Sequence, residues 1–394
     1  MSTTTTSKSG SAATVEPAKR AFDFLDLKAQ FATIREEVMA AVNRLMESQH
    51  FILGPEVQKL EEEIAGKLGA KFAVGCASGT DALILALLVA GIGKGDEVIT
   101  TPFSFIATAG SIAYVGATPV FVDIDPLTFN IDAKKIAMAI TAKTRAIMPV
   151  HLFGLSAELD PILKIAKDKK LLVIEDAAQA IGARYKNRYV GTFGEFGCFS
   201  FFPSKNLGGA GDGGLITTDS PQMAERLKMI RVHGSKKKYF HEILGTNSRL
   251  HALQAAILRV KLPHLDGWAA ARAERADRYR KEFERLGLSR FMQWPAAETA
   301  ENQHVYNQFT IRAQRRDGLK DSLQAAGVPT EIYYPLCLHL QKSFEYLGYK
   351  EGQMPVAEAA SKEVLSLPIY PELRNELQDR VIAGIAEFYG RSAA

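Results

Sequence analysis

Cysteine is scarce in this sequence. Only three occur among 394 residues, at the widely separated positions Cys76, Cys198 and Cys337. A disulfide framework or a cysteine-based zinc site needs more cysteines at closer spacing, so neither is expected. The histidines and carboxylates also lack metal-ligand spacing, so no metal is predicted. Few cysteines are compatible with a reducing compartment, and we expect a cytoplasmic protein.

Long hydrophobic runs are missing as well. The longest, 82–90, has nine residues, whereas a membrane-spanning helix needs roughly 20. The N-terminal MSTTTTSKSGSAATVEPAKR has no apolar core of the signal-peptide type. We therefore expect no membrane partner, and we expect 1–21 to be a disordered tail.

Charge of one sign is not in excess either. The sequence has 48 basic and 44 acidic residues, a net charge of +4, and 47% of its residues are hydrophobic. Nucleic-acid binding normally requires a clustered basic face, so no nucleic-acid partner is predicted. The composition is that of an ordinary globular protein.

Short apolar runs alternate with helical stretches between residues 71 and 176. Strands are expected at KFAVGC, DEVIT, TPVFVDI, RAIMPVH, LLVIED, 197–202 and 214–217. Helices are expected at 28–47, from Pro55 onward, and at 79–91, 104–115, 132–140, 156–169, 221–231 and 250–287, the last broken at Pro263. This alternation predicts an α/β fold with a largely parallel sheet.

The last hundred residues change in character. We expect strands at 305–313 and 328–334 and helices at 316–326 and 374–389. The predicted organisation is a large α/β domain over 22–288 and a small α+β domain over 289–394.

Ligands of open α/β sheets bind beyond the carboxyl ends of the strands. The segments that follow the expected strands are therefore the candidates for a site: 78–80, 101–105, His151, 175–179 and 203–214.

Lys205 lies in the segment SFFPSKNLGGAGDGG, directly after an expected strand. A lysine that is partly desolvated at a strand end has a lowered pKa and could form a Schiff base, although many loop lysines are only solvated. The glycines at 209–214 match G-x-G-x-x-G formally. That dinucleotide fingerprint requires a following helix, whereas Leu-Ile-Thr-Thr follows here, so we favour a tight backbone path beside a ligand.

Asp176 ends the apolar run LLVIED. It could cap a helix, or it could be the buried carboxylate that pyridoxal 5'-phosphate (PLP) requires at its pyridine nitrogen. Because Asp176 and Lys205 both follow strands, they could flank one ring.

Other segments could complete such a site. In ASGTDAL a helix begins near Gly79, and its free backbone amides could bind a phosphate with help from Ser200. Phe105 could stack on a flat ring, or it could be a core residue. Asn247 could cap a helix, Arg249 could bind an anionic group, and the lysines at 236–238 could line the mouth of a site for an anionic substrate.

Taken together, these segments resemble the DegT/StrS family of PLP-dependent nucleotide-sugar aminotransferases. The resemblance runs from about Phe22 to the C-terminus. It rests on FILGPEVQKLEEEIA, SGTDAL, GDEVITTPFSFIAT, PVFVDIDPLTFN, EDAAQA, SFFPSKNLGGAGDGG, NSRLHALQAAIL, YYPLCLH and LSLPIYPEL, in this order.

The resemblance implies a type I aminotransferase fold and a homodimer with shared active sites. Lys205 would carry PLP, Asp176 would pair with its ring nitrogen, and Gln179 and Phe105 would lie against the ring. Gly79, Thr80 and Ser200 would hold the phosphate together with Asn247 of the other subunit. Arg249 from the partner, Tyr334 and His339 would face the substrate.

The implied reaction is a transamination. An amino acid, L-glutamate by resemblance, would give its amino group to PLP, and a keto-sugar linked to a nucleotide diphosphate would receive it. Lys205 would move the proton as base and acid. NSRL and LQAAIL favour the 3-keto over the 4-keto class. Such enzymes make amino sugars for surface polysaccharides or secondary metabolites.

Two departures from the family pattern are visible. His251 stands where the family usually has Asp, and Cys337 stands where it often has Pro. Both bear on the substrate rather than on the cofactor. The alternatives are a PLP sugar dehydratase, in which a histidine replaces the lysine, and a non-enzymatic regulatory protein, for which no basic helix-turn-helix is apparent.

Overall fold

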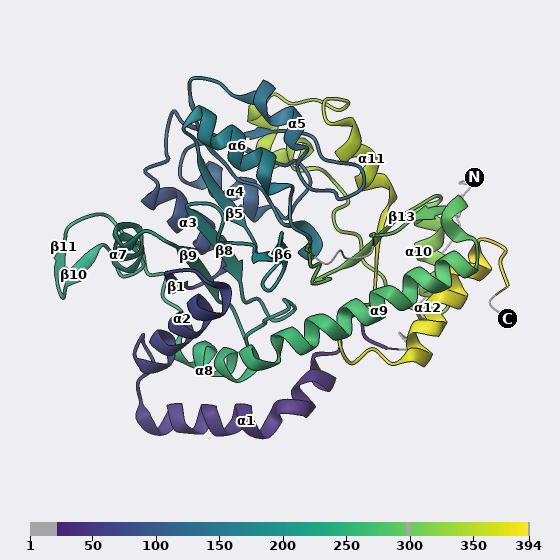
Figure 1. The fold of residues 1–394 in the computed structure, drawn as a ribbon, viewed down its shortest axis with the longest axis horizontal. Helices are drawn as coiled ribbons and strands as arrows, with labels where there is room; N and C mark the ends of the chain where they lie inside the picture. The colour runs from purple at the N-terminus through teal and green to yellow at the C-terminus, as the bar shows by residue number, and fades with distance from the viewer. Residues whose placement is uncertain (1–21, 297–300, 393–394) are drawn as a thin grey trace, which may run out of the picture.

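The computed structural model describes residues 22–296 and 301–392, and the predicted tail at 1–21 lies outside them. Its central feature is a seven-stranded sheet with the order β1-β9-β8-β5-β4-β2-β3 (Figure 1). The strands are β1 (Phe72–Cys76), β2 (Glu97–Thr100), β3 (Thr118–Phe121), β4 (Thr144–Ile147), β5 (Leu172–Asp176), β8 (Phe196–Ser200) and β9 (Gly214–Thr218). Only β9 is antiparallel to its neighbours, so the other six strands end at one edge of the sheet.

Both faces of this sheet are buried. Along β8 the side chains alternate, so that Phe196 and Cys198 enter one apolar core while Phe199 enters another. The helices around this sheet are α1 (Leu27–Ser48), α2 (Pro55–Leu68), α3 (Gly79–Val89), α4 (Ala107–Tyr114), α5 (Ala133–Ile136), α6 (Leu159–Lys169), α7 (Pro221–Ile230), α8 (Ala252–Lys261) and α9 (Leu265–Arg285). Among them, α1 packs on α8 rather than on the strands. The strands of a mostly parallel sheet are apolar because helices bury both of its faces. The predicted α/β architecture is therefore confirmed.

The predicted break at Pro263 is also confirmed. A short 3-10 turn, Leu262–His264, separates α8 from α9 there. Further 3-10 turns are Ala137–Ala139, Leu152–Gly154, Leu288–Arg290, Leu338–Leu340 and Lys342–Leu347.

A smaller antiparallel sheet follows near the C-terminus. It contains β12 (Met292–Gln293), β13 (Phe309–Ala313) and β14 (Val364–Leu367) in this order. With α10 (Arg316–Ala325), α12 (Asn375–Phe388) and one side of α9, it encloses its own apolar core. The helices expected at 316–326 and 374–389 are therefore present.

The strand predicted at 328–334 is wrong. Only an isolated bridge between Glu331 and Ser366 occurs in that segment. Its apolar residues instead pack into two cores, Val328 into that of the small sheet and Tyr334 into a neighbouring one. Sequence analysis missed α11 (Pro355–Glu363) and β14, whose short run VLSL gives little periodicity.

α11 shares an apolar core with residues of the large domain, and it also contacts β13 of the small sheet. Asp123, just beyond β3, accepts hydrogen bonds from the amides of Val356 (3.1 Å) and Ala357 (2.9 Å) at the start of α11. Because this carboxylate caps a helix from the C-terminal region, that region is tied to the large sheet, and the domain boundary near 288 stays a prediction.

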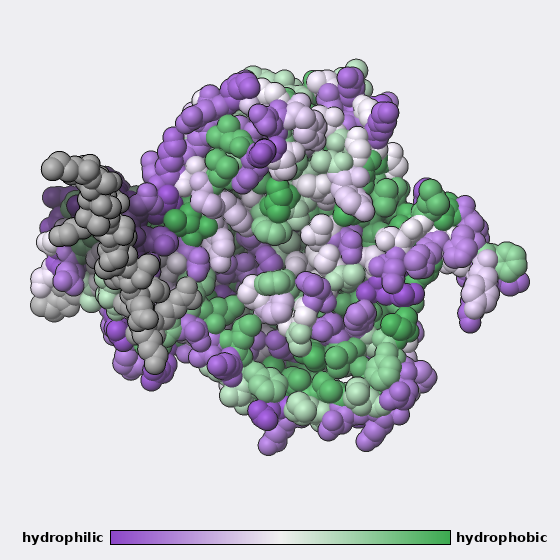
Figure 2. Space-filling view, turned by 180° about the vertical axis from the view of Figure 1, so that it is seen from behind, coloured by the Kyte–Doolittle hydropathy of each residue, from purple (hydrophilic) through white to green (hydrophobic). Residues whose placement is uncertain are grey.

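Two hairpins interrupt the long connections. The first pairs β6 (Arg184–Tyr185) with β7 (Arg188–Tyr189), and the second pairs β10 (Ser235–Lys237) with β11 (Phe240–His241). The β10–β11 hairpin projects from the body of the molecule (Figures 1 and 2). It contains the three lysines at 236–238, and 80% of Tyr239 and 62% of Phe240 are exposed. Among the helices of the described residues, none is long and apolar enough to cross a membrane.

Candidate active site

The carboxyl edge of the sheet gathers residues that are far apart in the sequence. Gly79 follows β1, Asp176 ends β5 and Ser200 ends β8. Gly214, at the start of the antiparallel β9, pairs with both Cys76 and Ser200 and so brings the ends of β1 and β8 together. Most candidates from sequence analysis therefore lie at one edge.

The start of α3 forms a small cradle beside Ser200. The Ser78 hydroxyl accepts a hydrogen bond from the Asp81 amide (3.1 Å). The amides of Gly79 and Thr80 lie in the first turn of α3, where no intrahelical carbonyl is available to accept from them. A Cβ at Gly79 would lie 2.6 Å from the Ser200 Cβ, so only glycine allows this approach. Two outward amides beside a hydroxyl, at the positive end of a helix, suit a phosphate.

Asp176 is a buried carboxylate with few partners. Its Oδ2 accepts from the Thr108 hydroxyl (2.7 Å) and its Oδ1 from the Ala178 amide (3.2 Å). Burial raises its pKa above the ordinary value, although these hydrogen bonds and the charge of Lys205 oppose the shift. A carboxylate in this position is suited to stabilise a ligand cation.

Lys205 lies in the loop that follows β8, with its amide bonded to the Phe202 carbonyl (2.9 Å). Burial lowers its pKa to about 8, and the attraction of Asp176 opposes that shift. A substantial fraction of its amine is therefore neutral near physiological pH, as a nucleophile or a base requires. Asp176 and Lys205 thus interact electrostatically across one site.

Aromatic and amide side chains lie beside this pair. Phe105 is 55% exposed, whereas Phe103 is fully buried, so Phe105 is the one available to a ligand. The Phe105 and Tyr334 ring centroids are 6.5 Å apart. Gln179 donates to the Tyr334 hydroxyl (3.0 Å) and accepts from the Phe153 amide (2.7 Å). These contacts place Tyr334 and Gln179 together.

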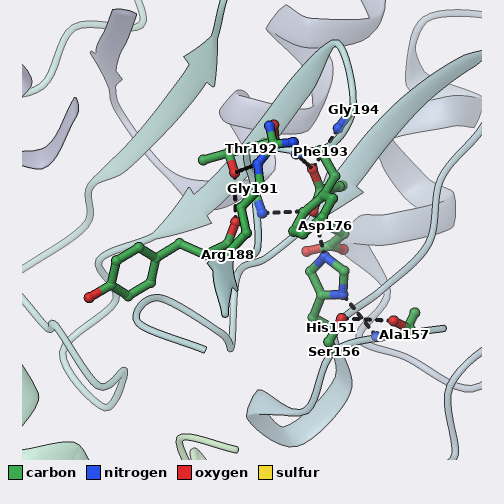
Figure 3. A network of polar contacts seen from close by, with 12 residues as sticks. His151, Ser156, Ala157, Asp176, Arg188, Gly191, Thr192, Phe193 and Gly194 are labelled. Atoms are coloured by element: carbon green, nitrogen blue, oxygen red, sulfur yellow. Dashed lines mark hydrogen bonds and ion pairs between the residues drawn. The ribbon is translucent and has the colours of Figure 1, made fainter. Parts of the chain in front are cut away.

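Glu175, next to Asp176, faces the opposite side of β5 and has the opposite pKa shift. Its oxygens accept from the amides of Gly191, Phe193 and Gly194 and from His151 (2.9 Å). Figure 3 shows these four partners together. Burial alone would raise its pKa, but the His151 and amide bonds outweigh burial and lower it. Because Nδ1 of His151 accepts from the Ala157 amide (3.1 Å), its Nε2 carries the proton that points to Glu175.

The segment with Asn247 and Arg249 lies beside the end of β1 in the same chain. The Ser248 hydroxyl between them accepts from the Ala77 amide (3.3 Å), and Asn247 itself is exposed. The assignment of Asn247 and Arg249 to the other subunit's site therefore stays a prediction.

His339 is not brought to the edge of the sheet by its own contacts. It is 2% exposed, pairs with Glu358 (3.1 Å) and packs on Phe121 and Tyr349. Its expected contact with a sugar stays a prediction that these contacts do not support.

These residues fit PLP. The buried Asp176 carboxylate has lone pairs left for a ring nitrogen, the lowered pKa of Lys205 suits a covalent linkage, and the cradle at Gly79 suits the phosphate. Within the described residues, no group of His, Cys, Asp and Glu could hold a metal ion.

Sequence analysis missed two residues that organise this site. Thr108 is fully buried in α4, and its hydroxyl donates to Asp176. The Ser104 hydroxyl lies 2.8 Å from the Thr108 hydroxyl. Thr108 was visible only as part of TPFSFIAT, where nothing distinguishes it from a surface threonine. His151 and Glu175 both lay in the candidate segments, but nothing in the sequence indicated that their side chains form a hydrogen bond.

Comparisons with known proteins agree with this geometry. The sequence model of the DegT/DnrJ/EryC1/StrS aminotransferase family matches residues 32–386. The chain is 53% identical over 365 residues to a pleiotropic regulatory protein of Geobacillus stearothermophilus, which covers 93% of this chain and 98% of that one. It is 47% identical over 361 residues to the UDP-N-acetyl-3-dehydro-alpha-D-glucosamine 3-aminotransferase of Acidithiobacillus ferrooxidans, which covers 92% and 96%.

A solved structure has the same fold. DesV of S. venezuelae, crystallised in complex with a ketimine intermediate, superimposes with a TM-score of 0.91 at 42% identity. The match covers 95% of this chain and all of DesV.

Proposed function

The chain belongs to the DegT/DnrJ/EryC1/StrS aminotransferase family, and we propose that it transfers an amino group from L-glutamate to a 3-keto sugar carried on a nucleoside diphosphate. Several relatives are named as nucleotide-sugar aminotransferases, and the solved NtdA of Bacillus subtilis holds the cofactor PMP. The observation that carries the assignment is that the buried Asp176 and Lys205, whose pKa is lowered, follow the ends of the neighbouring parallel strands β5 and β8.

PLP, when bound, supplies an electron sink for the carbanion that forms at the substrate carbon. Asp176 would hold a proton at the ring nitrogen, and its cost of burial is offset when it faces that cation. The Thr108 and Ala178 donors fix the carboxylate orientation. Gly79, Thr80 and Ser200 would bind the phosphate, and Phe105 would cover one face of the ring.

Lys205 has two tasks in this assignment. Its amine would hold the cofactor covalently, and as a free amine it would act as the base and acid that moves a proton from the donor carbon. A base is most effective when its pKa is close to the working pH, and burial gives Lys205 a pKa of about 8.

The 3-keto position is supported by the names of the relatives. One aminates a 3-dehydro sugar of UDP, and others form dTDP-3-amino sugars. L-Glutamate is proposed as donor from the resemblance of the motifs alone.

A homodimer with shared sites completes the proposal. Asn247 is exposed although it lies in a motif expected to bind phosphate, and the β10–β11 hairpin exposes aromatic side chains beside three lysines. Both are available to a second copy of the chain.

The test is an absorption spectrum of the purified protein, before and after L-glutamate is added. We expect a visible band from PLP held by Lys205, and we expect L-glutamate to bleach it. Lys205→Ala should abolish covalent attachment and turnover, while the exposed Lys228→Ala serves as the matched control and should retain both. Turnover by Lys205→Ala would refute the assignment.

A second experiment decides the acceptor. UDP- and dTDP-linked 3-keto and 4-keto sugars are offered separately, and the position of the new amine is read by NMR. Amination at C4 alone would refute the 3-keto proposal while leaving the transaminase intact. A protein that never binds PLP would instead favour a regulatory function like that named for the Geobacillus relative.

A further inference from the structure

We propose that Lys261 and Gln254 of α8 are positioning residues that hold the loop carrying Lys205, which we call the lysine loop (203–214). The two residues are seven positions apart, so they lie on the same face of the helix two turns apart. This inference rests on the function proposed for Lys205.

Lys261 is a buried cation bonded to the lysine loop. It is 9% exposed, and its ammonium donates to the Gly208 carbonyl (2.7 Å), three residues after Lys205. Burial of an ammonium group is costly unless the group is hydrogen-bonded, so the bond to Gly208 is important for Lys261 as well as for the loop.

Gln254 binds the loop two residues further on. Its Oε1 accepts the Ala210 amide (2.7 Å). A Cβ at Gly209 would lie 2.7 Å from the same oxygen, so the loop and the amide are packed closely. Gln254 and Lys261 therefore bond two consecutive parts of the loop.

The lysine loop needs such contacts because its own sequence imposes little conformation. Glycine occupies 208, 209, 211, 213 and 214, and glycine has the largest conformational freedom of any residue. Closer to Lys205 on the same side, Asn206 donates to the Val305 carbonyl (2.7 Å) and accepts from Asn307 (2.8 Å). The segment that follows Lys205 is thus held by two sets of side-chain contacts, of which α8 supplies one.

α8 also begins directly after the segment that contains Arg249. The amide of Ala252, its first residue, bonds to the Phe51 carbonyl (3.1 Å), and the helix packs on α1 and α2 (Figure 1). One rigid helix therefore connects the lysine loop to the predicted substrate arginine. If α8 loses its hydrogen bonds to the lysine loop, the chemical step should be impaired more than substrate binding.

The experiment compares Lys261→Met with Lys261→Arg, which keeps a cationic donor. For Lys261→Met we expect kcat to fall by about 10²-fold, since displacement of a reacting group by ~1 Å costs that much, with KM for L-glutamate little changed. The visible circular dichroism of bound PLP should change as well, because it reports how the cofactor is held. Lys261→Arg should recover most of both signals.

Arg259→Met is the matched control. Arg259 belongs to the same helix but pairs with Glu56 (2.6 Å) and Glu63 (2.7 Å) away from the loop. It should retain the kcat and dichroism of the unmodified enzyme even where thermal stability falls. If Lys261→Met does not fold, the half-buried Gln254→Leu decides, with the same expected split between kcat and KM.

Unchanged kcat and dichroism in Lys261→Met or Gln254→Leu would overturn the inference, as would an equal loss in Arg259→Met. Lys205→Ala separates this failure from that of the proposed function. If Lys205→Ala abolishes turnover while the α8 variants retain it, only the positioning role is refuted.

Discussion

Thr108→Val tests how the protein manages the buried charge of Asp176. The substitution conserves volume and β-branching but removes the hydroxyl that donates to Oδ2 (2.7 Å). Because an ionised carboxylate only accepts, the Thr108 proton must point to Asp176, and Ser104 must donate to Thr108 in turn. Thr108→Val therefore breaks the chain of hydrogen bonds from Ser104 through Thr108 to the Asp176 carboxylate.

The expected cost depends on the state of Asp176. A hydrogen bond to a charged group contributes about 1.5–3 kcal/mol, whereas a bond between neutral groups contributes about 0.5–1.5 kcal/mol. Thr108→Val should therefore lower the free energy of unfolding more at neutral pH than in acid. It should also raise the Asp176 pKa further above its ordinary value, because a contact that stabilises the ionised form is lost.

The sign follows from linkage. In the native protein without cofactor, the pKa of Asp176 is raised, so the native state binds its proton more readily than the unfolded state. Stability from this group is complete below the unfolded pKa and is lost as pH rises through the native pKa. Thr108→Val should enlarge that loss.

The assay is denaturant unfolding of cofactor-free protein at neutral and acidic pH. Thr100→Val is the matched control, because Thr100 is equally buried but its hydroxyl donates to a backbone carbonyl, that of Met148 (2.9 Å). The cost of Thr100→Val should not vary with pH. If Thr108→Val behaves in the same way, the carboxylate does not depend on the Thr108 hydroxyl and the reasoning is refuted.

Two further substitutions test the site. Gly79→Ala should destabilise the protein by about 1–3 kcal/mol and weaken PLP retention measured by dialysis, because its methyl would collide with Ser200; Gly66→Ala, where a Cβ meets nothing within 4 Å, should be neutral or stabilising. Glu175→Gln should cost at least about 1.5–3 kcal/mol at neutral pH, because it removes the charged acceptor of His151 and of three backbone amides. Since the pKa of Glu175 is lowered, that stability is present above its unfolded pKa and is lost in acid, so the cost measured by thermal unfolding should shrink as pH falls.

The candidate site was largely predictable because its chemistry lies at strand ends. Asp176 ends β5, and Lys205 follows β8. Both strands are apolar runs that must be buried, and parallel strands end at one edge, so the pairing of these two residues followed from local patterns.

Contacts that depend on packing between distant segments were not predictable. The segment 328–334 contains the β-branched and aromatic residues typical of a strand, yet its side chains divide between two cores. His339 lies in a motif expected to bind sugar, yet its ring pairs with Glu358. Periodicity reports how often a side chain is buried but not against which partner it is buried.

The amino-acid sequence by itself determined the α/β alternation, the order of the motifs and the lysine and aspartate of the site, because these depend on periodicity and on residue type. Only the tertiary structure decided that Thr108 donates a hydrogen bond to Asp176 and that Lys261 donates one to the lysine loop. It also decided that the pKa values of Glu175 and Asp176, which are adjacent on one strand, shift in opposite directions. Burial and hydrogen bonds from segments remote in the chain decide the ionisation of a carboxylate, and no local pattern records them.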